Sequence, residues 1–589
     1  MSFPSLSSVR ALLGWVGLPV LHCAGFLLLL ISATEFLESF GGLPSLLPAW
    51  RVEIPLLAYL YLYFRAIIRP SRWQPVIAAL PIILVYAIFD IYHVLFGRQL
   101  RIIEVTELPE MFLVLPFLNM ILLVSAVVLP LAIFLRAVQW RWRLRPLVFG
   151  GLPLLALVVA VEGFPAPFMA GFEWIQKPVH WMSDTKQARL NGRIGMALYN
   201  EARRINSLEK TMAYRDNSRY LNAFDNMVET VEDVRRKSNV HLIVLESFLD
   251  PKLLRNARFS RNPEHPSFTA LFKDQAGLSI SPVFGGSTAQ AEFEVLCGVP
   301  ALRELSGIEF DVFTGARTLC LPNILGQAGY HTMATNAFYP DFFNATKAYE
   351  GTGFQSIYFP REHAPVGGSY FQAGDVTGEF FMYDGTLFSQ NLAFVSDWMR
   401  QHPGKPLLNY VMTIYGHTPH LINLDKRPRL VKVSGTAAIL DDQLERAVNQ
   451  YYYRTEAIAA YVRELMRIDP QSIIILVSDH LPSLTYGPNT YEDLHYIDNI
   501  EGAIHANRIY IVENGRPVRY DTMHHYEIPG IILSYLTRDN ILNLLGLYGS
   551  QPGPQSRSNL REQYLAVMAQ AMDGSPIFFR FGNRKAYAK

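Results

Sequence analysis

Five apolar runs crowd the first 170 residues of this 589-residue chain. Each is long enough to cross a bilayer as a helix, which takes roughly 20 residues. The second run is the weakest, because charged residues shorten its apolar centre to Ile54–Phe64. A cleaved signal peptide does not explain the first run, since further runs follow without an evident small-residue cleavage site. A buried helical core in a soluble protein is the less favoured alternative. We therefore expect a membrane domain with spans near residues 11–33, 49–68, 75–96, 111–135 and 146–168.

Arginines between these runs predict the orientation of the membrane domain. They precede the first run, separate the second from the third, and separate the fourth from the fifth. Clusters of this kind stay on the cytoplasmic side. With the N-terminus inside, five spans leave everything after about residue 170 outside the cytoplasm. The arginines concerned are Arg10; Arg65, Arg69 and Arg72; and Arg136, Arg141, Arg143 and Arg145.

The rest of the chain divides at a change of pattern near residue 238. Residues 1–170 form the expected transmembrane domain, and the polar stretch 171–238 predicts interfacial and connecting helices. From residue 239 to 589, short β-branched runs alternate with helical segments, which favours an α/β domain with a mostly parallel sheet covered by helices. A net charge of +1 excludes nucleic acid as an expected partner.

Polar side chains follow three of the expected strands, where ligands bind in open α/β sheets. Glu246 ends "VHLIVLE", His417 follows "LLNYVMTIYG", and "DH" at Asp479 and His480 ends "SIIILVSDH". One such residue is usually a cap on the next helix. Two carboxylates and an imidazole together suit a borderline or hard divalent ion. The metal site would still need an oxygen ligand.

The segment "GGSTAQAEFE" offers that oxygen. Its two glycines let the backbone approach an anionic phosphate at a helix start, and a bound metal activates a hydroxyl as a nucleophile. Thr288 is our first choice and Ser287 the second. A plain helix N-cap is the alternative for Thr288.

These motifs, in this order and behind five apolar runs, resemble the branch of the sulfatase (alkaline phosphatase) superfamily that holds lipoteichoic acid synthases and periplasmic glucan phosphoglycerol transferases. The likeness covers about Val240–Tyr535. It implies an alkaline-phosphatase-like fold, a Thr288 nucleophile and one divalent ion, Mn2+ or Mg2+ with Zn2+ as a further candidate. The implied metal ligands are Glu246, Thr288, Asp479 and His480.

The resemblance also implies substrate contacts. His417 matches a histidine that contacts the substrate phosphoryl group, and Phe343 and Asn344 match part of a head-group pocket. Ala345 stands where those synthases have an arginine, so a different head group or another cation is expected. Lys347 and Arg361 are the nearest candidates, with a solvated surface role as the favoured reading.

Cys297 and Cys320 lie 23 residues apart in the outer domain, a spacing that permits a disulfide worth roughly 3 kcal/mol. A pair at similar places occurs in the glucan transferases; two buried free thiols are the alternative.

The expected function is transfer of phosphoglycerol from phosphatidylglycerol, or of phosphoethanolamine from phosphatidylethanolamine, to a glycan outside the bacterial inner membrane. The catalytic domain would lie in the periplasm. A sulfatase, a phosphodiesterase or a non-catalytic glycan-binding protein is less favoured. True sulfatases carry Cys/Ser-x-Pro-x-Arg, and "CGVPALR" at Cys297 departs from that spacing.

Overall fold

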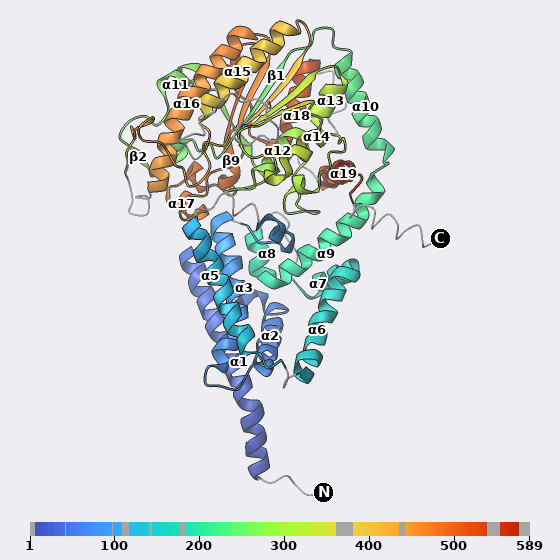
Figure 1. The fold of residues 1–589 in the computed structure, drawn as a ribbon, viewed down its shortest axis with the longest axis vertical. Coiled ribbons are helices and arrows are strands. Elements are labelled where there is room, and N and C mark those ends of the chain that lie inside the picture. Colours follow the sequence, from blue (N-terminus) through green and yellow to red (C-terminus); the bar gives the residue numbers. More distant parts are fainter. Residues whose placement is uncertain are drawn as a thin grey trace. The chain divides into compact units, whose positions relative to one another are not determined.

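The chain forms two compact units, residues 1–207 and 208–589, called here the membrane unit and the outer unit. The structure is a computed structural model (Figure 1). It describes residues 6–41, 43–96, 98–108, 117–140, 144–176, 184–360, 381–434, 442–538 and 554–575.

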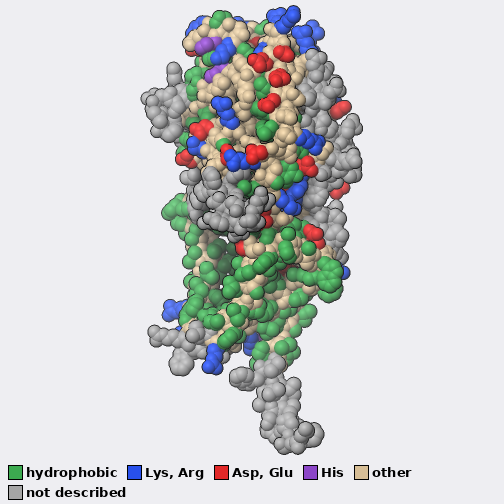
Figure 2. Space-filling model, turned by 90° about the vertical axis from the view of Figure 1, so that its right-hand side faces the viewer, with side chains coloured by type: hydrophobic (Ala, Val, Ile, Leu, Met, Phe, Trp, Pro, Cys, Tyr) green, Lys and Arg blue, Asp and Glu red, His purple; other side chains and the backbone are tan. Residues whose placement is uncertain are grey.

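The membrane unit is helical. Among its described residues, four helices contain segments long and apolar enough to cross a membrane: Gly17–Glu38, Gln74–Phe96, Phe117–Ala137 and Arg145–Gly163. Between 6% and 22% of each apolar window is buried, so most of these side chains face outward, as in lipid-facing helices. Figure 2 shows hydrophobic side chains spread over these helices. The helices of the unit are α1 (Leu6–Gly41), α2 (Glu53–Ile67), α3 (Gln74–Phe96), α5 (Phe117–Ala137), α6 (Leu144–Gly163), α7 (Pro165–Ile175), α8 (Asp184–Asn191) and α9 (Arg193–Thr211).

The structure corrects the expected span near residues 49–68. That region forms α2, which has 15 residues and therefore a length of about 22 Å, short of the roughly 30 Å of a hydrocarbon core. The helix packs between α1, α3 and α6. Its C-terminal end is tied to that of α5, because Arg69 N–H donates to the carbonyl of Ala137 and Gln139 N–H donates to that of Ile67. Residues 111–116 of the expected fourth span lie outside the described residues.

Helix α2 carries a charged residue, Glu53, inside an apolar bundle because that residue caps another helix. Its buried carboxylate accepts hydrogen bonds from the backbone N–H groups of Arg193, Ile194 and Gly195 at 2.8–3.0 Å. These N–H groups open α9 and have no partner within the helix, so Glu53 caps the positive end of the helix dipole. Gly192 (φ +88°) precedes them, and a Cβ there would lie 2.4 Å from the Glu53 carboxyl.

The outer unit is built around a nine-stranded sheet. Along its main path the strand order is β11-β3-β9-β8-β1-β6-β4-β5, and β10 pairs with β9. Strands β8, β1, β6, β4 and β5 run parallel, whereas β9 is antiparallel to both β8 and β3. The predicted α/β fold with a mostly parallel sheet is confirmed. The strands are β1 (Val240–Leu245), β3 (Ala276–Ile280), β4 (His331–Asn336), β5 (Ser356–Tyr358), β6 (Leu407–Met412), β8 (Ile473–Ser478), β9 (Ala506–Glu513), β10 (Arg516–Val518) and β11 (Met523–His524); β2 (Arg258–Phe259) and β7 (Val433–Ser434) form a separate ribbon.

Helices cover both faces of the sheet (Figure 1). Every residue of β1, β6 and β8 is buried, as expected for strands packed on two sides. Alternate residues of β1, namely Val240, Leu242 and Val244, enter the core that includes α10, α12, α13 and α18. On the other face lie α11, α15 and α16. The helices are α10 (Ser218–Glu232), α11 (Pro266–Phe272), α12 (Thr288–Cys297), α13 (Leu321–Gln327), α14 (Ala345–Thr352), α15 (Asp384–Gln401), α16 (Asp442–Ile468), α17 (Pro488–Asp493), α18 (Ile528–Thr537) and α19 (Pro554–Ala571).

Candidate active site

Two neighbouring parallel strands bring the predicted carboxylates together. Leu245 of β1 pairs in register with Ser478 of β8, so Glu246 and Asp479, the next residues, leave the sheet side by side. The backbone N–H of Ser247 donates to Asp479 Oδ1 at 2.7 Å, which ties the two strand ends. Residues far apart in the chain thus meet because both follow the carboxyl end of a strand.

A tight loop delivers Thr288 to the same place. Gly285, Gly286 and Ser287 all have positive φ (71°, 155° and 62°), and α12 begins at Thr288. Positive φ is costly for serine, so the neighbouring structure must hold this turn. Thr288 Oγ1 donates to Glu246 Oε2 at 3.1 Å and lies 3.4 Å from His480 Nε2. Ser287 is the N-cap residue, and its side chain makes no cap hydrogen bond. The hydroxyl of Thr288 therefore faces the carboxylate and the imidazole.

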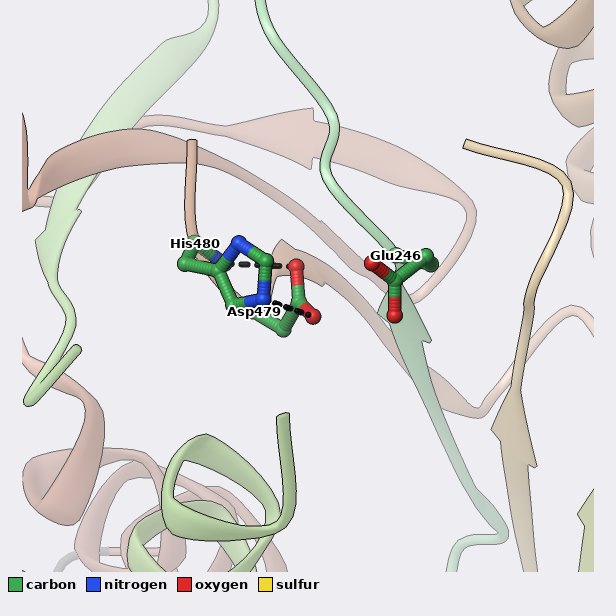
Figure 3. Close-up of side chains that lie close together, drawn as sticks. All are labelled: Glu246, Asp479 and His480. Atoms are coloured by element: carbon green, nitrogen blue, oxygen red, sulfur yellow. Dashed lines mark hydrogen bonds and ion pairs between the residues drawn. The ribbon is translucent and has the colours of Figure 1, made fainter. Parts of the chain in front are cut away.

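Glu246, Asp479 and His480 form a buried cluster whose ligand atoms all lie within 4.8 Å of one another (Figure 3). Asp479 Oδ2 is buried without a hydrogen-bond partner. His480 Nδ1 lies 2.9 Å from the carbonyl of Leu481, a contact that requires an N–H there and leaves Nε2 with its lone pair. Asp479 Oδ2 and His480 Nε2 lie 3.2 Å apart, so a carboxylate oxygen and an imidazole nitrogen, both of them usual metal ligands, meet beside Glu246.

The electrostatics of the cluster also favour a bound cation. Burial, reinforced by the charge of Asp479, raises the pKa of Glu246. Burial raises the pKa of Asp479 to about 7. Two buried carboxylates this close favour protonation unless a cation lies between them. The residues present therefore suit a metal ion and could hold one with Thr288 beside it.

Arg454 is a positioning residue that the sequence analysis missed. It lies fully buried on α16, and its Nη1 donates to the backbone carbonyl of Glu246 at 2.7 Å. Its Nε donates to Asp384 at 2.6 Å, so the guanidinium has a counter-ion. Gly416 packs against this contact, because a Cβ there would lie 2.1 Å from the Glu246 carbonyl oxygen. An arginine among the tyrosines of "YYYRTEA" was the available signal.

Glu292 on α12 is a buried carboxyl group close to the cluster but outside it. The hydroxyls of Tyr349 and Tyr410 donate to its Oε2 at 2.5 and 2.7 Å. Burial raises the pKa of Glu292 to about 7, although both hydroxyls act in the opposite direction. This group anchors the helix that starts at Thr288 to the sheet.

The predicted substrate residues do not all lie at the cluster. His417 is half-buried, and its ring centroid lies 5.1 Å from that of Phe381. The amide of Asn344 donates to the carbonyls of Phe310 and Phe313 at 2.8 and 2.9 Å, so its donor atom is already used.

The other residues predicted to contact the substrate head group lie in different environments. Phe343 (φ 49°) packs against the core, and Lys347 is exposed beside Glu350 at 2.7 Å. Arg361 lies outside the described residues. Asn344, Phe343 and Lys347 therefore have partners other than Glu246, Asp479 and His480.

A disulfide closes the segment that follows α12. Cys297, the last residue of α12, is bonded to Cys320, with an S–S distance of 2.08 Å. Both residues are fully buried.

Comparison with known proteins agrees with this architecture. Residues 238–529 match the family model described as Sulfatase. This part of the chain therefore carries a domain that matches the sulfatase family, as the sequence predicted. The N-terminal boundary of the match lies two residues before β1.

Two curated relatives share part of the chain. A Rhizobium meliloti (strain 1021) protein named for cyclic beta-1,2-glucan modification is 26% identical over 273 residues, covering 45% of this chain and 38% of the relative. An uncharacterised Haemophilus influenzae protein is 25% identical over 205 residues, covering 32% of this chain and 34% of the relative. The matched segments thus span little more than a third of either relative.

Solved structures with low sequence identity are also similar. The Streptococcus pyogenes phosphoglycerol transferase GacH, in complex with sn-glycerol-1-phosphate, aligns with a TM-score of 0.46 at 16% identity, covering 64% of this chain and 96% of that one. The lipoteichoic acid synthase LtaP from Listeria monocytogenes aligns with a TM-score of 0.40 at 16% identity, covering 53% and 77%.

Proposed function

We propose that the chain is a membrane-anchored transferase that moves the phosphoglycerol head group of a phospholipid to a hydroxyl of an extracytoplasmic glycan. One observation carries the proposal. A threonine hydroxyl sits at the start of α12, 3.1 Å from a buried carboxylate and 3.4 Å from an imidazole nitrogen. Such a hydroxyl is suited to attack phosphorus once it is deprotonated.

The first half-reaction uses Thr288. Its hydroxyl loses its proton and Oγ1 attacks the phosphorus of the donor lipid, the bond from phosphorus to the diacylglycerol oxygen breaks, and that oxygen takes up a proton as diacylglycerol leaves. Thr288 then carries the head group as a phosphodiester. A metal held by Glu246, Asp479 and His480 would lower the pKa of the hydroxyl and stabilise charge on the phosphoryl oxygens.

The second half-reaction restores the threonine. A glycan hydroxyl attacks the same phosphorus, loses its proton, and displaces Thr288 Oγ1, which regains a proton. His417 follows the neighbouring strand β6 and is our candidate for contacting the phosphoryl group or handling the proton. Water in place of the glycan would give hydrolysis.

The acceptor and the location rest on different evidence. The Rhizobium meliloti relative is named for glucan modification, which supports a glycan acceptor. The apolar helices supply an anchor that keeps the enzyme with its lipid donor. We propose that the outer unit lies in the periplasm and that the residues near Arg143 lie in the cytoplasm. An alkaline phosphatase reporter fused after residue 240 should then be active, and one fused near Arg143 inactive; the reverse would overturn this topology.

Transfer of phosphoethanolamine is the second candidate. Ala345 offers no cation for a glycerol phosphate, and the amide donor of Asn344 is taken by backbone carbonyls. A sulfatase is disfavoured, because Cys297, the cysteine nearest to that family's motif, is bonded to Cys320.

Mass analysis of the covalent intermediate tests the proposal. The full chain is incubated with phosphatidylglycerol or phosphatidylethanolamine without acceptor, quenched in acid and digested. We expect glycerophosphate on the peptide that contains Thr288. Phosphoethanolamine there would select the second candidate, and no adduct from either lipid, despite release of diacylglycerol, would exclude the covalent route.

A further inference from the structure

Large hydrophobic side chains are exposed at few places on the outer unit. Among its described residues these are Tyr339, Leu421, Leu424, Leu430, Tyr486 and Ile500. All six lie in loops that follow the carboxyl ends of β4, β6 or β8. Those strands and β1 are parallel, so the exposed apolar residues gather at the edge of the sheet that holds Glu246 and Asp479. The exposed apolar residues therefore lie on the same side of the sheet as the candidate active site.

Half of these residues lie in one short segment, 421–432, which we call the β6 lip. Leu421, Leu424 and Leu430 are 39%, 51% and 37% exposed. The lip is held in place by α16, since Gln450 donates to the carbonyl of Leu421 and Asn449 accepts from the backbone N–H groups of residues 430 and 431. The leucines are therefore kept at the surface by a fixed backbone.

Charge distinguishes the β6 lip from the neighbouring loop. The lip has four basic residues and one acidic residue, and its Lys426 and Lys432 are exposed. Arg429 is offset by Asp442 and Glu445 of α16. The loop after β8, residues 481–505, holds four acidic residues and no lysine or arginine. An anionic surface would thus attract the lip and repel the β8 loop.

We propose that the β6 lip is a lipid-contact surface that inserts its leucines at the head-group boundary of an anionic phospholipid bilayer. Leucines flanked by lysines are the composition that such boundaries bind. The lip starts four residues after His417, so this contact brings the candidate active site to the layer where a phospholipid head group lies. The purpose of the contact rests on the proposed function, whereas its existence can be tested without turnover.

A fluorescence experiment on the full-length chain tests the contact. A Cys23→Ala background removes the unpaired thiol, because the other two cysteines are bonded to each other. Leu424→Cys is labelled with nitrobenzoxadiazole in vesicles of phosphatidylglycerol and phosphatidylcholine that contain lipids spin-labelled near the head group. Gln401→Cys is the matched control, since it is exposed and ends α15 before β6 begins.

We expect most of the fluorescence at position 424 to be quenched and that at position 401 to be retained. Equal quenching at both positions, or none at 424, would overturn the proposal. Energy transfer between labelled chains without quenching by lipid would instead make the lip a contact between two copies, and would also overturn it. Lys426→Gln with Lys432→Gln should reduce quenching in anionic vesicles and leave it unchanged in purely zwitterionic ones; no reduction would overturn the role of charge.

Turnover gives an independent measurement. Leu421→Ser with Leu424→Ser should raise KM for a long-chain donor in vesicles by about fivefold, from two lost leucine insertions. Release of glycerol phosphate from a short-chain, water-soluble donor should be unchanged. If neither donor turns over in the parent protein while position 424 is still quenched, the proposed function fails and the lipid contact stands. If the double variant loses both donors equally, the contact fails.

Discussion

Strand β1 carries a buried polar cluster at each end, and the two clusters differ in how fully they are hydrogen-bonded. Near its start, His241 contacts Asp469 at 3.0 Å and receives a hydrogen bond from Asn409 at 3.3 Å. Asn409 in turn bonds Asn391 and Tyr461. We call these five residues the base cluster. After its end, Glu246, Thr288, Asp479 and His480 form the site cluster.

The base cluster satisfies itself, whereas the site cluster does not. None of the five base-cluster residues has a buried side-chain atom without a hydrogen-bond partner. In the site cluster Asp479 Oδ2 has no hydrogen-bond partner, although His480 Nε2 lies 3.2 Å away, and burial raises the pKa of both carboxylates. Satisfied buried networks stabilise a fold, while unsatisfied ones cost free energy. The difference separates polar residues that hold the sheet together from those arranged for a ligand.

The largest effect should come from Thr288, the proposed nucleophile. Thr288→Ala should reduce release of diacylglycerol by at least about a thousandfold, because the covalent step is lost. Ser287→Ala is the matched control and should keep a measurable rate. Thermal unfolding of both variants should stay close to that of the parent. A Thr288→Ala protein that turns over near the parent rate would place the nucleophile elsewhere.

Asp479→Asn should separate stability from metal binding. The amide oxygen can still accept from the backbone N–H groups of Ser247 and His480, while the charge beside Glu246 disappears. We expect the metal-free variant to melt at a higher temperature than the metal-free parent. Added Mn2+ should stabilise the parent, by about 2.7 kcal/mol at 100 times Kd, and leave the variant unchanged.

Chelated parent protein with and without Mn2+ supplies the reference for that comparison. A variant that still gains stability from Mn2+ would show that Asp479 is not a ligand. A parent that gains none would argue against a metal in the site cluster.

Asn409→Leu, in the base cluster, should instead lower stability and leave turnover unchanged. It removes the hydrogen bonds that Asn409 makes with His241, Asn391 and Tyr461, and we expect a loss of about 3 kcal/mol of folding stability. Tyr461→Phe, which removes one hydroxyl, should cost about 1 kcal/mol. Both variants should turn over at the parent rate at temperatures where they remain folded. A reduced rate without a change in melting temperature would contradict the division between the clusters.

Glu292 should give a stability effect that depends on pH. Its pKa is raised by burial to about 7 from a value of 4.5, so the folded state binds the proton more tightly than the unfolded state. This contribution is fully present below pH 4.5 and is lost as the pH rises to about 7. Glu292→Gln should remove about 2 kcal/mol of that decline. Melting temperatures of parent and variant at pH 5 and pH 8 check this, and equal pH slopes would refute it.

Much of the fold could be predicted because its signals are local. Apolar runs of bilayer length, and short β-branched runs that end in Glu246 or Asp479, depend on residues close together in the chain. Parallel strands then bring their carboxyl ends to one edge, whatever the connections between them. The meeting of Glu246, Asp479 and His480 at one edge was predictable for this reason.

The tertiary structure decided what depends on packing between distant segments. The sequence left Thr288 and Ser287 as alternatives, and the positive φ of Ser287 turns the Thr288 hydroxyl toward Glu246. Arg454 meets Glu246 across 208 residues, a contact that no local pattern encodes.

The same limit applies to α2 and to Asn344. The short helix α2 ends in a bundle where Glu53 caps α9, 140 residues away, and Asn344 bonds carbonyls that only the folded chain brings near. Sequence alone determined which residues could perform chemistry and at which edge of the sheet. Packing determined which of them face one another, because hydrogen-bond geometry depends on distances set by elements remote in the chain.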